Sequence, residues 1–164
     1  METISHVIAK KKVVYVIDDS ESYQKILQAH LSQLGFQVIS FFNVADCLKS
    51  SHPKPDVILL DQNLGDGEFG INHLPQLQSR IPSVPIVFLS VDGNITTVTE
   101  AIRKGAFDYI EKNSAAFVRL RTTLDNVFNS FDHQKKIRKK LFLWVGVASI
   151  IVTILLLVWY FKTN

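Results

Sequence analysis

Short β-forming apolar runs alternate with helical patterns along most of this 164-residue chain, and this alternation limits the fold more than any other feature. Strands that alternate with helices form a parallel sheet with helices packed on its faces. The predicted strands are residues 13–17, 37–41, 57–60, 86–89 and 107–110. The predicted helices are residues 21–34, 44–50, 72–80, 94–104 and a fifth that begins near Ser114. We therefore expect an α/β fold, a doubly wound five-stranded parallel sheet.

Capping residues support this division into elements. Ser20 and Asn43 stand where the first two helices begin, and side chains of this type accept hydrogen bonds from the free N–H groups of a first turn. Gly35 and Gly105 follow the first and fourth helices, where glycine permits the left-handed conformation that ends a helix. These residues therefore mark the ends of helices in the sequence segments that connect consecutive strands.

Polar side chains follow the predicted strands where ligands collect in an open parallel sheet, beyond the carboxyl ends. These residues are Asp18 and Asp19 after the first strand, Asp61 at the end of the third, Ser90 at the end of the fourth and Lys112 after the fifth. Three neighbouring carboxylates repel one another unless a cation neutralises them, and Mg2+ with oxygen ligands is the natural choice. Ser90 and Lys112 could then bind a tetrahedral oxyanion, with Asp61 as the nucleophile. The chemistry predicted is phosphoryl transfer to a carboxylate.

Four segments make the chain resemble the receiver domain of two-component response regulators, of the chemotaxis-regulator type. They read VVYVIDDS (13–20), DVILLDQNLGDG (56–67), PIVFLS (85–90) and AIRKGAFDYIEK (101–112). The resemblance covers about residues 12–131, and the separations of 29 residues from Asp61 to Ser90 and 22 from Ser90 to Lys112 fit the family. It implies a flavodoxin-like receiver fold in a signalling protein that accepts a phosphoryl group and is not otherwise an enzyme.

The resemblance also implies roles for residues around the acceptor. Asp61 would receive the phosphoryl group from a histidine kinase or a phosphotransfer protein. Mg2+ would be held by Asp19 and Asp61, by the main-chain carbonyl of Asn63, and by Asp18 largely through water. The signal would pass to a downstream protein target through contacts that depend on phosphorylation, or the phosphoryl group would be shuttled onward.

A second group of residues would sense the phosphoryl group. Ser90 and Lys112 would each bind one of its oxygens, and Tyr109 would be the aromatic switch that turns inward when Ser90 moves. Their shift would bias a surface formed by the fourth helix, the fifth strand and the fifth helix.

Four positions depart from the family pattern, one of them Val91, which follows Ser90 where a small residue is typical and would narrow access for the phosphodonor. Asn113 stands where Pro is usual after the lysine, and a cis peptide there would cost about 2.5 to 4 kcal/mol. Gly65 replaces a usual Pro four residues after the acceptor, and Phe69 stands where Gly is common. We expect from these two changes a more mobile loop between Asp61 and Gly70.

Charge is distributed unevenly along the chain. Of the 18 basic residues, five lie in the run KKIRKK at 135–140 and one is Lys162, which leaves 12 against all 15 acidic residues in residues 1–134, a net charge of −3. This balance argues against nucleic acid as a partner, because binding to phosphates needs a basic surface. The single Cys47 excludes an intramolecular disulfide and a cysteine-built zinc site.

The segment 141–161 has no charged residue and is apolar apart from Gly146, Ser149 and Thr153. As a helix it would reach roughly 32 Å, close to the thickness of a bilayer core. Aromatic residues near both ends and the basic run on its N-terminal side are typical of a membrane span with that side in the cytoplasm. We expect a C-terminal transmembrane anchor in the inner (cytoplasmic) membrane, with the receiver domain in the cytoplasm.

These features predict five parts: an N-terminal extension (1–11), a receiver domain (12–134), a basic juxtamembrane segment (135–140), a transmembrane helix (141–161) and a short non-cytoplasmic tail (162–164). The spacing of Ser149 and Thr153 permits helix association, so a homodimer is one hypothesis. The alternative function is a receiver-fold adaptor that is not phosphorylated and binds its partner constitutively at the membrane. A third reading, an aspartate-based phosphohydrolase, lacks the second Asp of that motif.

Overall fold

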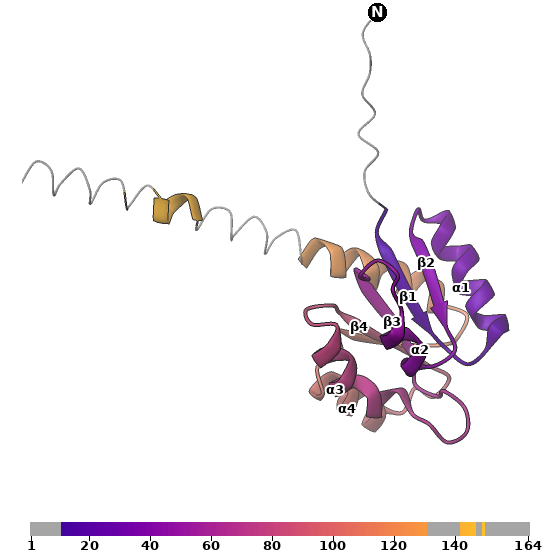
Figure 1. Ribbon diagram of the computed structural model, residues 1–164. Helices are drawn as coiled ribbons and strands as arrows, with labels where there is room; N and C mark the ends of the chain where they lie inside the picture. The colour runs from indigo at the N-terminus through magenta and orange to yellow at the C-terminus, as the bar shows by residue number, and fades with distance from the viewer. Residues whose placement is uncertain (1–10, 131–141, 147–148, 150–164) are drawn as a thin grey trace, which may run out of the picture. The chain divides into compact units, whose positions relative to one another are not determined.

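The computed structural model describes residues 11–130, 142–146 and 149 of the chain (Figure 1). Its strands are β1 (Val13–Ile17), β2 (Gln37–Phe41), β3 (Val57–Asp61), β4 (Ile86–Ser90) and β5 (Asp108–Glu111). Its helices are α1 (Glu21–Gln33), α2 (Val44–Lys49), α3 (Gly70–Arg80) and α4 (Ile95–Arg103), and residues 116–130 are also helical. The predicted order of elements is confirmed, with boundaries that differ by at most two residues.

All strand pairs are parallel, and the sheet has the order β2-β1-β3-β4-β5. The chain therefore builds the sheet outward first on one side of β1 and then on the other. The point where the order reverses lies between β1 and β3, and open α/β sheets bind their ligands there, beyond the carboxyl ends of the strands. The last residue of β3 is Asp61, and Asp18 directly follows β1.

The three central strands β1, β3 and β4 are buried on both faces, as their nearly unbroken apolar sequences require. Alternate residues of β1 point to opposite faces, so Tyr15 packs in a core with residues of α2 and α3 such as Cys47 and Leu74. On the other face α1 lies beside the helix that begins at residue 116, where the His30 and Phe117 rings are 4.7 Å apart. The doubly wound arrangement is thus confirmed.

The predicted caps form. The Ser20 hydroxyl accepts a hydrogen bond from the Tyr23 N–H at 3.3 Å, and the Asn43 side chain accepts one from the Asp46 N–H at 2.8 Å. Gly35 and Gly105 adopt φ of 89° and 92°, a conformation that strains residues with a side chain. Turns at these positions return the chain to the sheet and so fix where the next strand begins.

The chain divides into two compact units, residues up to Thr123 and residues from Leu124. In the second unit residues 142–146 are helical, and the side chains of Phe142, Leu143, Trp144 and Val145 are all exposed. Among the residues that the structure describes, no helix is long and apolar enough to cross a membrane. Most of the predicted anchor at 141–161, the basic segment, the tail and most of the N-terminal extension lie outside those residues.

Candidate functional site

Three carboxylates meet at the point where the strand order reverses. Asp18, Asp19 and Asp61 each offer an oxygen, and these oxygens lie within 4.8 Å of one another. Asp18 is fully buried and Asp61 is 6% exposed, whereas Asp19 is exposed. The structure places these three side chains together because β1 and β3 are neighbours and both end here.

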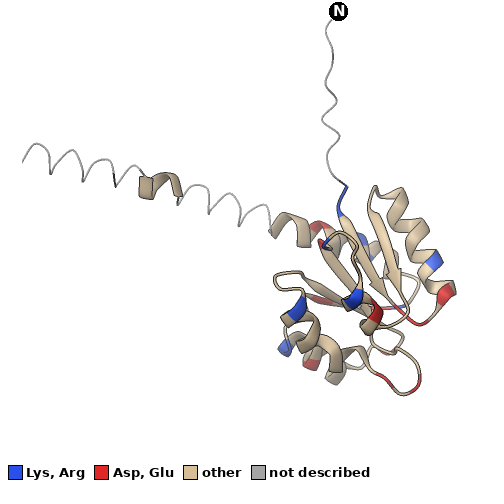
Figure 2. Cartoon of the chain, viewed as in Figure 1, with Lys and Arg blue, Asp and Glu red and all other residues tan. Residues whose placement is uncertain are grey.

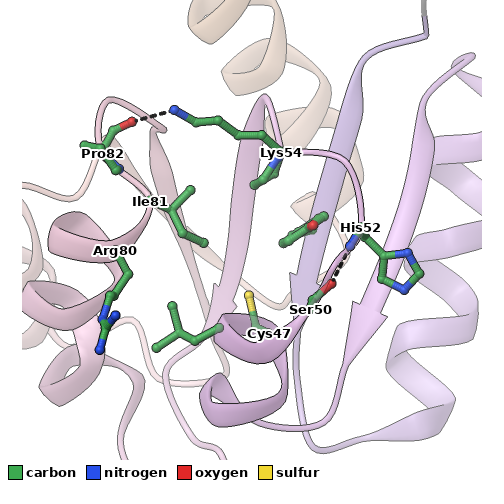
Figure 3. A pocket seen from close by; sticks show the side chains of 10 residues that line it. Cys47, Ser50, His52, Lys54, Arg80, Ile81 and Pro82 are labelled. Atoms are coloured by element: carbon green, nitrogen blue, oxygen red, sulfur yellow. Dashed lines mark hydrogen bonds between the residues drawn. The ribbon is translucent and has the colours of Figure 1, made fainter.

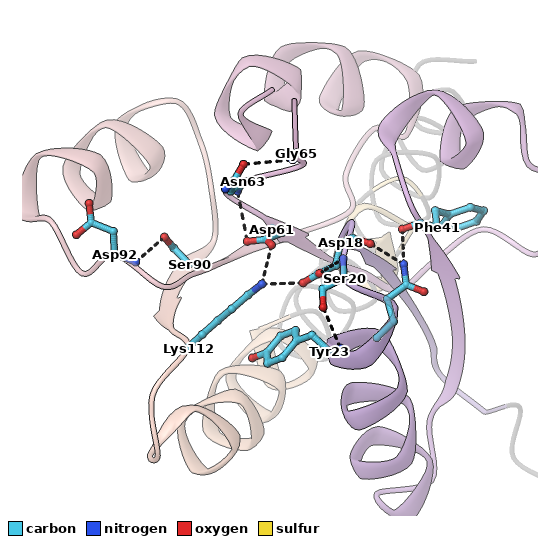
Figure 4. A network of polar contacts seen from close by, with 11 residues as sticks. Asp18, Ser20, Tyr23, Phe41, Asp61, Asn63, Gly65, Ser90, Asp92 and Lys112 are labelled. Atoms are coloured by element: carbon cyan, nitrogen blue, oxygen red, sulfur yellow. Dashed lines mark hydrogen bonds and ion pairs between the residues drawn. The ribbon is translucent and has the colours of Figure 1, made fainter. Parts of the chain in front are cut away.

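The Lys112 ammonium group lies between two of these carboxylates (Figure 4). Its Nζ is 2.7 Å from Asp18 Oδ2 and 2.6 Å from Asp61 Oδ2, and only 11% of the lysine side chain is exposed. Ion pairs with this little access to water are screened far less than surface pairs. Lys112 follows β5, two strands away from β3, so the pairing joins the centre of the sheet to its edge.

Burial dominates the electrostatics of Asp61. Loss of hydration raises the pKa of its carboxyl group, Lys112 opposes that rise, and the nearby Asp18 carboxylate adds to it. The other oxygen, Oδ1, accepts a long hydrogen bond of 3.4 Å from the Asn63 N–H. The ionised Asp61 carboxylate is therefore poorly hydrated and lies beside a second carboxylate, so a bound divalent cation would stabilise it.

Ser90 and Tyr109 lie on the two strands beyond β3 and are connected through one loop. The Ser90 hydroxyl accepts a hydrogen bond of 3.1 Å from the Asp92 N–H, and the Tyr109 hydroxyl donates to the Asp92 carbonyl. Asp92 in turn accepts from the N–H of Asn94, the N-cap of α4. Tyr109 is only 4% exposed, so the structure holds its ring in the inward position.

Asn63 begins the loop that follows β3, and its side chain accepts a hydrogen bond of 3.2 Å from the Gly65 N–H. Main-chain bonds from Glu68 to Gly65 and from Leu64 to Glu68 close the loop further. The Gly70 N–H bonds the Gln62 carbonyl at 2.8 Å, and a Cβ at Gly70 would overlap the Asp61 carbonyl oxygen. The backbone therefore passes so close to the Asp61 carbonyl at position 70 that only glycine fits there. The position where the family pattern has glycine, here Phe69, is one residue earlier.

Residue 113 joins β5 to the helix that follows. The residues described by the structure contain no cis peptide bond, so Lys112–Asn113 is trans, in keeping with the absence of Pro. The Lys112 N–H donates to the Ser90 carbonyl at 2.6 Å, and the Asn113 side chain accepts from the Ala115 N–H at 2.9 Å. These bonds fix the backbone that presents Lys112 without a proline.

Two residues of α1 complete the site and were not found from the sequence. The Tyr23 ring lies 4.2 Å below the Lys112 Nζ, and burial together with Asp18 and Asp61 raises the pKa of its hydroxyl to about 12. Gln24, 7% exposed, donates to the carbonyls of Asp18 at 2.6 Å and Phe41 at 3.0 Å. The available signal for Gln24 was a polar residue on the buried face of α1, in register with Leu27 and Leu31.

The residues present fit a magnesium ion. The ligand set is all oxygen, which hard divalent cations prefer, and it includes the exposed carboxylate of Asp19. A Cβ at Gly65 would come within 2.8 Å of Asp19 Oδ2, so glycine keeps that side of the carboxylate open. Asp19 and Asp61 would hold the ion directly, and Lys112 already compensates the charge of Asp18.

Replacement of Asp61 by Asn tests the electrostatic strain. A carboxyl group whose pKa is raised by folding favours the folded state below its unfolded pKa, and loses that contribution as pH rises through the folded value. We expect Asp61→Asn, without divalent cations, to raise the denaturant midpoint at neutral pH. The gain should shrink as pH falls into the range where Asp61 itself is protonated.

The matched control for this measurement is Asp66→Asn, in the same loop. Asp66 is exposed and has a φ of 49°, which Asn tolerates, so the midpoint should stay within the error of the measurement. If wild type and the Asp61→Asn variant have the same denaturant midpoint at neutral pH, the ionised Asp61 carboxylate does not destabilise the fold, and the interpretation is wrong.

Known proteins are similar to this chain in sequence. The chain is 34% identical over 112 residues to the luminescence regulatory protein LuxO of Vibrio campbellii, covering 68% of this chain and 24% of LuxO. It is 31% identical over 104 residues to the DNA-binding transcriptional regulator NtrC of Escherichia coli, covering 63% of this chain and 22% of NtrC. The chain thus spans about a quarter of the length of these relatives.

A crystal structure of a response regulator protein from Burkholderia pseudomallei with a phosphorylated aspartic acid, a calcium ion and citrate is similar in fold. Its TM-score is 0.63 at 26% identity, over 76% of this chain and 73% of that one. The sequence model of the response regulator receiver domain matches residues 14–125 of this chain. Receiver domains are phosphoacceptor signalling domains that are phosphorylated on Asp, bind Mg2+ at an acidic pocket and imply a histidine kinase or phosphotransfer partner. The chain therefore belongs to the response regulator receiver domain family.

Proposed function

We propose that this protein is a membrane-tethered response regulator that accepts a phosphoryl group on Asp61. One observation carries the choice of Asp61: it is the acceptor-type carboxylate whose oxygen contacts Lys112, at the carboxyl end of the strand next to the Asp18–Asp19 pair. The other carboxylates of the same loop, Asp66 and Glu68, are exposed. Asp18 is also buried and also contacts Lys112, but its side chain is fully inaccessible and its other oxygen accepts a 2.9 Å hydrogen bond from the Ser20 N–H. The Asp61 side chain is 8% exposed, and its other oxygen accepts only the long bond of 3.4 Å from Asn63, so Asp61 has an oxygen that is available to react.

The transfer step follows from these contacts. A carboxylate oxygen of Asp61 attacks the phosphorus of a phosphohistidine; the new O–P bond forms as the N–P bond breaks, and the imidazole nitrogen leaves with the bonding pair and takes up a proton. When bound, Mg2+ supplies positive charge that offsets the phosphoryl oxygens. Lys112 would offset the same charge, since its Nζ is already within 2.6 Å of Asp61.

The phosphoryl group is read out through Ser90. A phosphoryl oxygen would compete for the Ser90 hydroxyl, which now accepts from the Asp92 N–H, and Asp92 also contacts Tyr109 and the N-cap of α4. The rearranged surface would include the apolar side chains of Val91, Ile95 and Phe107, which are exposed. A downstream protein that binds α4 and β5 would therefore sense the state of Asp61.

The membrane tether is proposed from the sequence of residues 135–161. The uncharged stretch 141–161 is long enough to span a bilayer and follows five cations within six residues. Its described part supports the proposal, because residues 142–145 are helical with 61% to 82% of each residue exposed, which is unfavourable for apolar groups in water. Tethering would keep the domain at high local concentration beside membrane kinases.

Phosphorylation by a small donor tests the acceptor. The full chain in detergent, incubated with Mg2+ and acetyl phosphate, should gain one phosphoryl group by intact-mass spectrometry. Asp61→Asn should gain none, while the matched variant Asp66→Asn should gain as much as wild type. Removal of Mg2+ should abolish the gain. A wild-type chain that takes up no phosphoryl group, yet binds its partner equally with and without Asp61→Asn, would favour the constitutive adaptor.

Deletion of residues 141–164 tests the tether. The full chain should float with lipid vesicles in a density gradient, and the shortened chain should remain at the bottom, because the apolar stretch supplies most of the membrane affinity. Both chains should accept phosphate from acetyl phosphate equally. Flotation of the shortened chain at the wild-type level contradicts the proposed anchor.

A further inference from the structure

The two edges of the parallel sheet carry opposite charge. Within residues 11–123, the edge at the carboxyl ends of the strands, here called the carboxyl edge, has nine acidic residues and two basic ones. The acidic residues are Asp18, Asp19, Glu21, Asp46, Asp61, Asp66, Glu68, Asp92 and Glu111, and the basic ones are Lys25 and Lys112. The net charge of −7 is concentrated on the side that holds the phosphoacceptor.

The opposite edge, where the strands begin, is here called the amino edge and has nine basic residues against three acidic ones. The basic residues are Lys11, Lys12, Lys49, Lys54, Arg80, Arg103, Lys104, Arg119 and Arg121. The acidic residues Asp56, Glu100 and Asp108 all have cationic partners, for instance Lys104 at 2.8 Å from Glu100. In Figure 2 the blue residues before β1 lie at the end of the sheet opposite the red residues of the loop after β3. The amino edge has a net charge of +6.

The chain leaves the first unit at the amino edge. The Thr123 hydroxyl donates to Asp108 Oδ2 at 2.6 Å, and Arg119 lies 3.4 Å from Asp108 Oδ1. Asp108 is the first residue of β5, so the helix has returned to the start of the strands by Thr123. Eleven residues then separate Thr123 from Lys135, the first cation of the basic segment.

A hollow of about 270 Å³ opens near this edge, between the segment that leads into β3 and the end of α3 (Figure 3). Lys54, Arg80 and His52 lie around it, and none of the residues that line it in the described part of the chain is acidic. Lys54 Nζ donates to the Pro82 carbonyl at 3.0 Å, which keeps the ammonium group beside the hollow. At about 30 Å³ per water, there is room for a phosphate group and its hydration.

We propose that the amino edge docks on the anionic headgroups of the membrane, with a lipid phosphate in the hollow between Lys54 and Arg80. The inference rests on the proposed tether and adds an orientation to it. Cations attract an anionic lipid surface, while the carboxyl edge is repelled by it. The acceptor site then faces away from the bilayer, where a kinase can reach it.

Energy transfer to the membrane measures this orientation in the full chain. A donor dye is attached at Ser83→Cys, in the exposed loop before β4, or at Ser22→Cys, exposed at the carboxyl edge, with a headgroup acceptor dye in the vesicles. Cys47 is buried and burial raises the pKa of its thiol to about 12, so it does not react with the dye. Transfer from residue 83 should exceed transfer from residue 22 in phosphatidylserine-containing vesicles.

The difference should disappear in phosphatidylcholine vesicles and at high salt, which screens exposed charges. Lys54→Glu with Arg80→Glu should weaken docking by about 30-fold or more and remove the difference. The matched control compares single variants: Lys25→Glu makes the same change in net charge as Lys54→Glu but lies at the carboxyl edge, so it should preserve the difference that Lys54→Glu reduces. Acceptance of phosphate from acetyl phosphate by each variant confirms that it is folded.

The outcomes separate the two proposals. Protein that floats with vesicles but shows equal transfer from both labels, or a difference independent of lipid charge, overturns the orientation and leaves the tether standing. Protein that floats with neither type of vesicle overturns the tether and the orientation with it. Loss of the difference in the Lys25→Glu control as well would reduce the effect to net charge and would also overturn a docking role for Lys54 and Arg80.

Discussion

The ion pair of Lys112 with Asp18 and Asp61 is the interaction on which the rest of the structure depends. It joins residues 94 and 51 positions apart in the sequence, and it lets two carboxylates lie buried beside each other at the point where the strand order reverses. A cation in this place lowers the repulsion between them, but it does not remove the strain on Asp61, whose pKa stays raised by burial. A carboxylate held in this way, beside an open all-oxygen site, gains from a bound divalent cation, whose positive charge would also offset the phosphoryl oxygens.

The fold also explains how charge is arranged around that site. In a parallel sheet with crossover helices, every strand ends at one edge and every helix returns to the other, so acidic strand-end and first-turn residues gather on one side. Each of the helices α1 to α4 has a basic residue or His in its last turn, near the other side. The same topology that builds the acceptor site therefore produces a basic surface away from it, beside the point where the chain departs toward its basic and apolar segments.

Much of this was predictable from sequence because the signals were local. Strand runs, caps and the glycines after helices fixed the order of elements, and the rule for carboxyl ends then brought Asp18, Asp61 and Lys112 together. Tyr23 and Gln24 were missed because their roles depend on how α1 packs against the end of β1, which periodicity does not give. The requirement for glycine at position 70 could not be predicted, because it depends on how closely the loop passes the Asp61 carbonyl. The membrane segment stays a prediction, since most of it lies outside the residues that the structure describes.

Chemical mapping of the phosphorylated residue tests the central claim most directly. Borohydride reduces an aspartyl phosphate to homoserine, so protein treated with acetyl phosphate and Mg2+, then reduced and digested, should carry homoserine at position 61 and retain aspartate at 18, 19 and 66. That result would locate the acyl phosphate at the carboxylate that contacts Lys112. Homoserine at another position, with an unmodified residue 61, would contradict the account of this pocket.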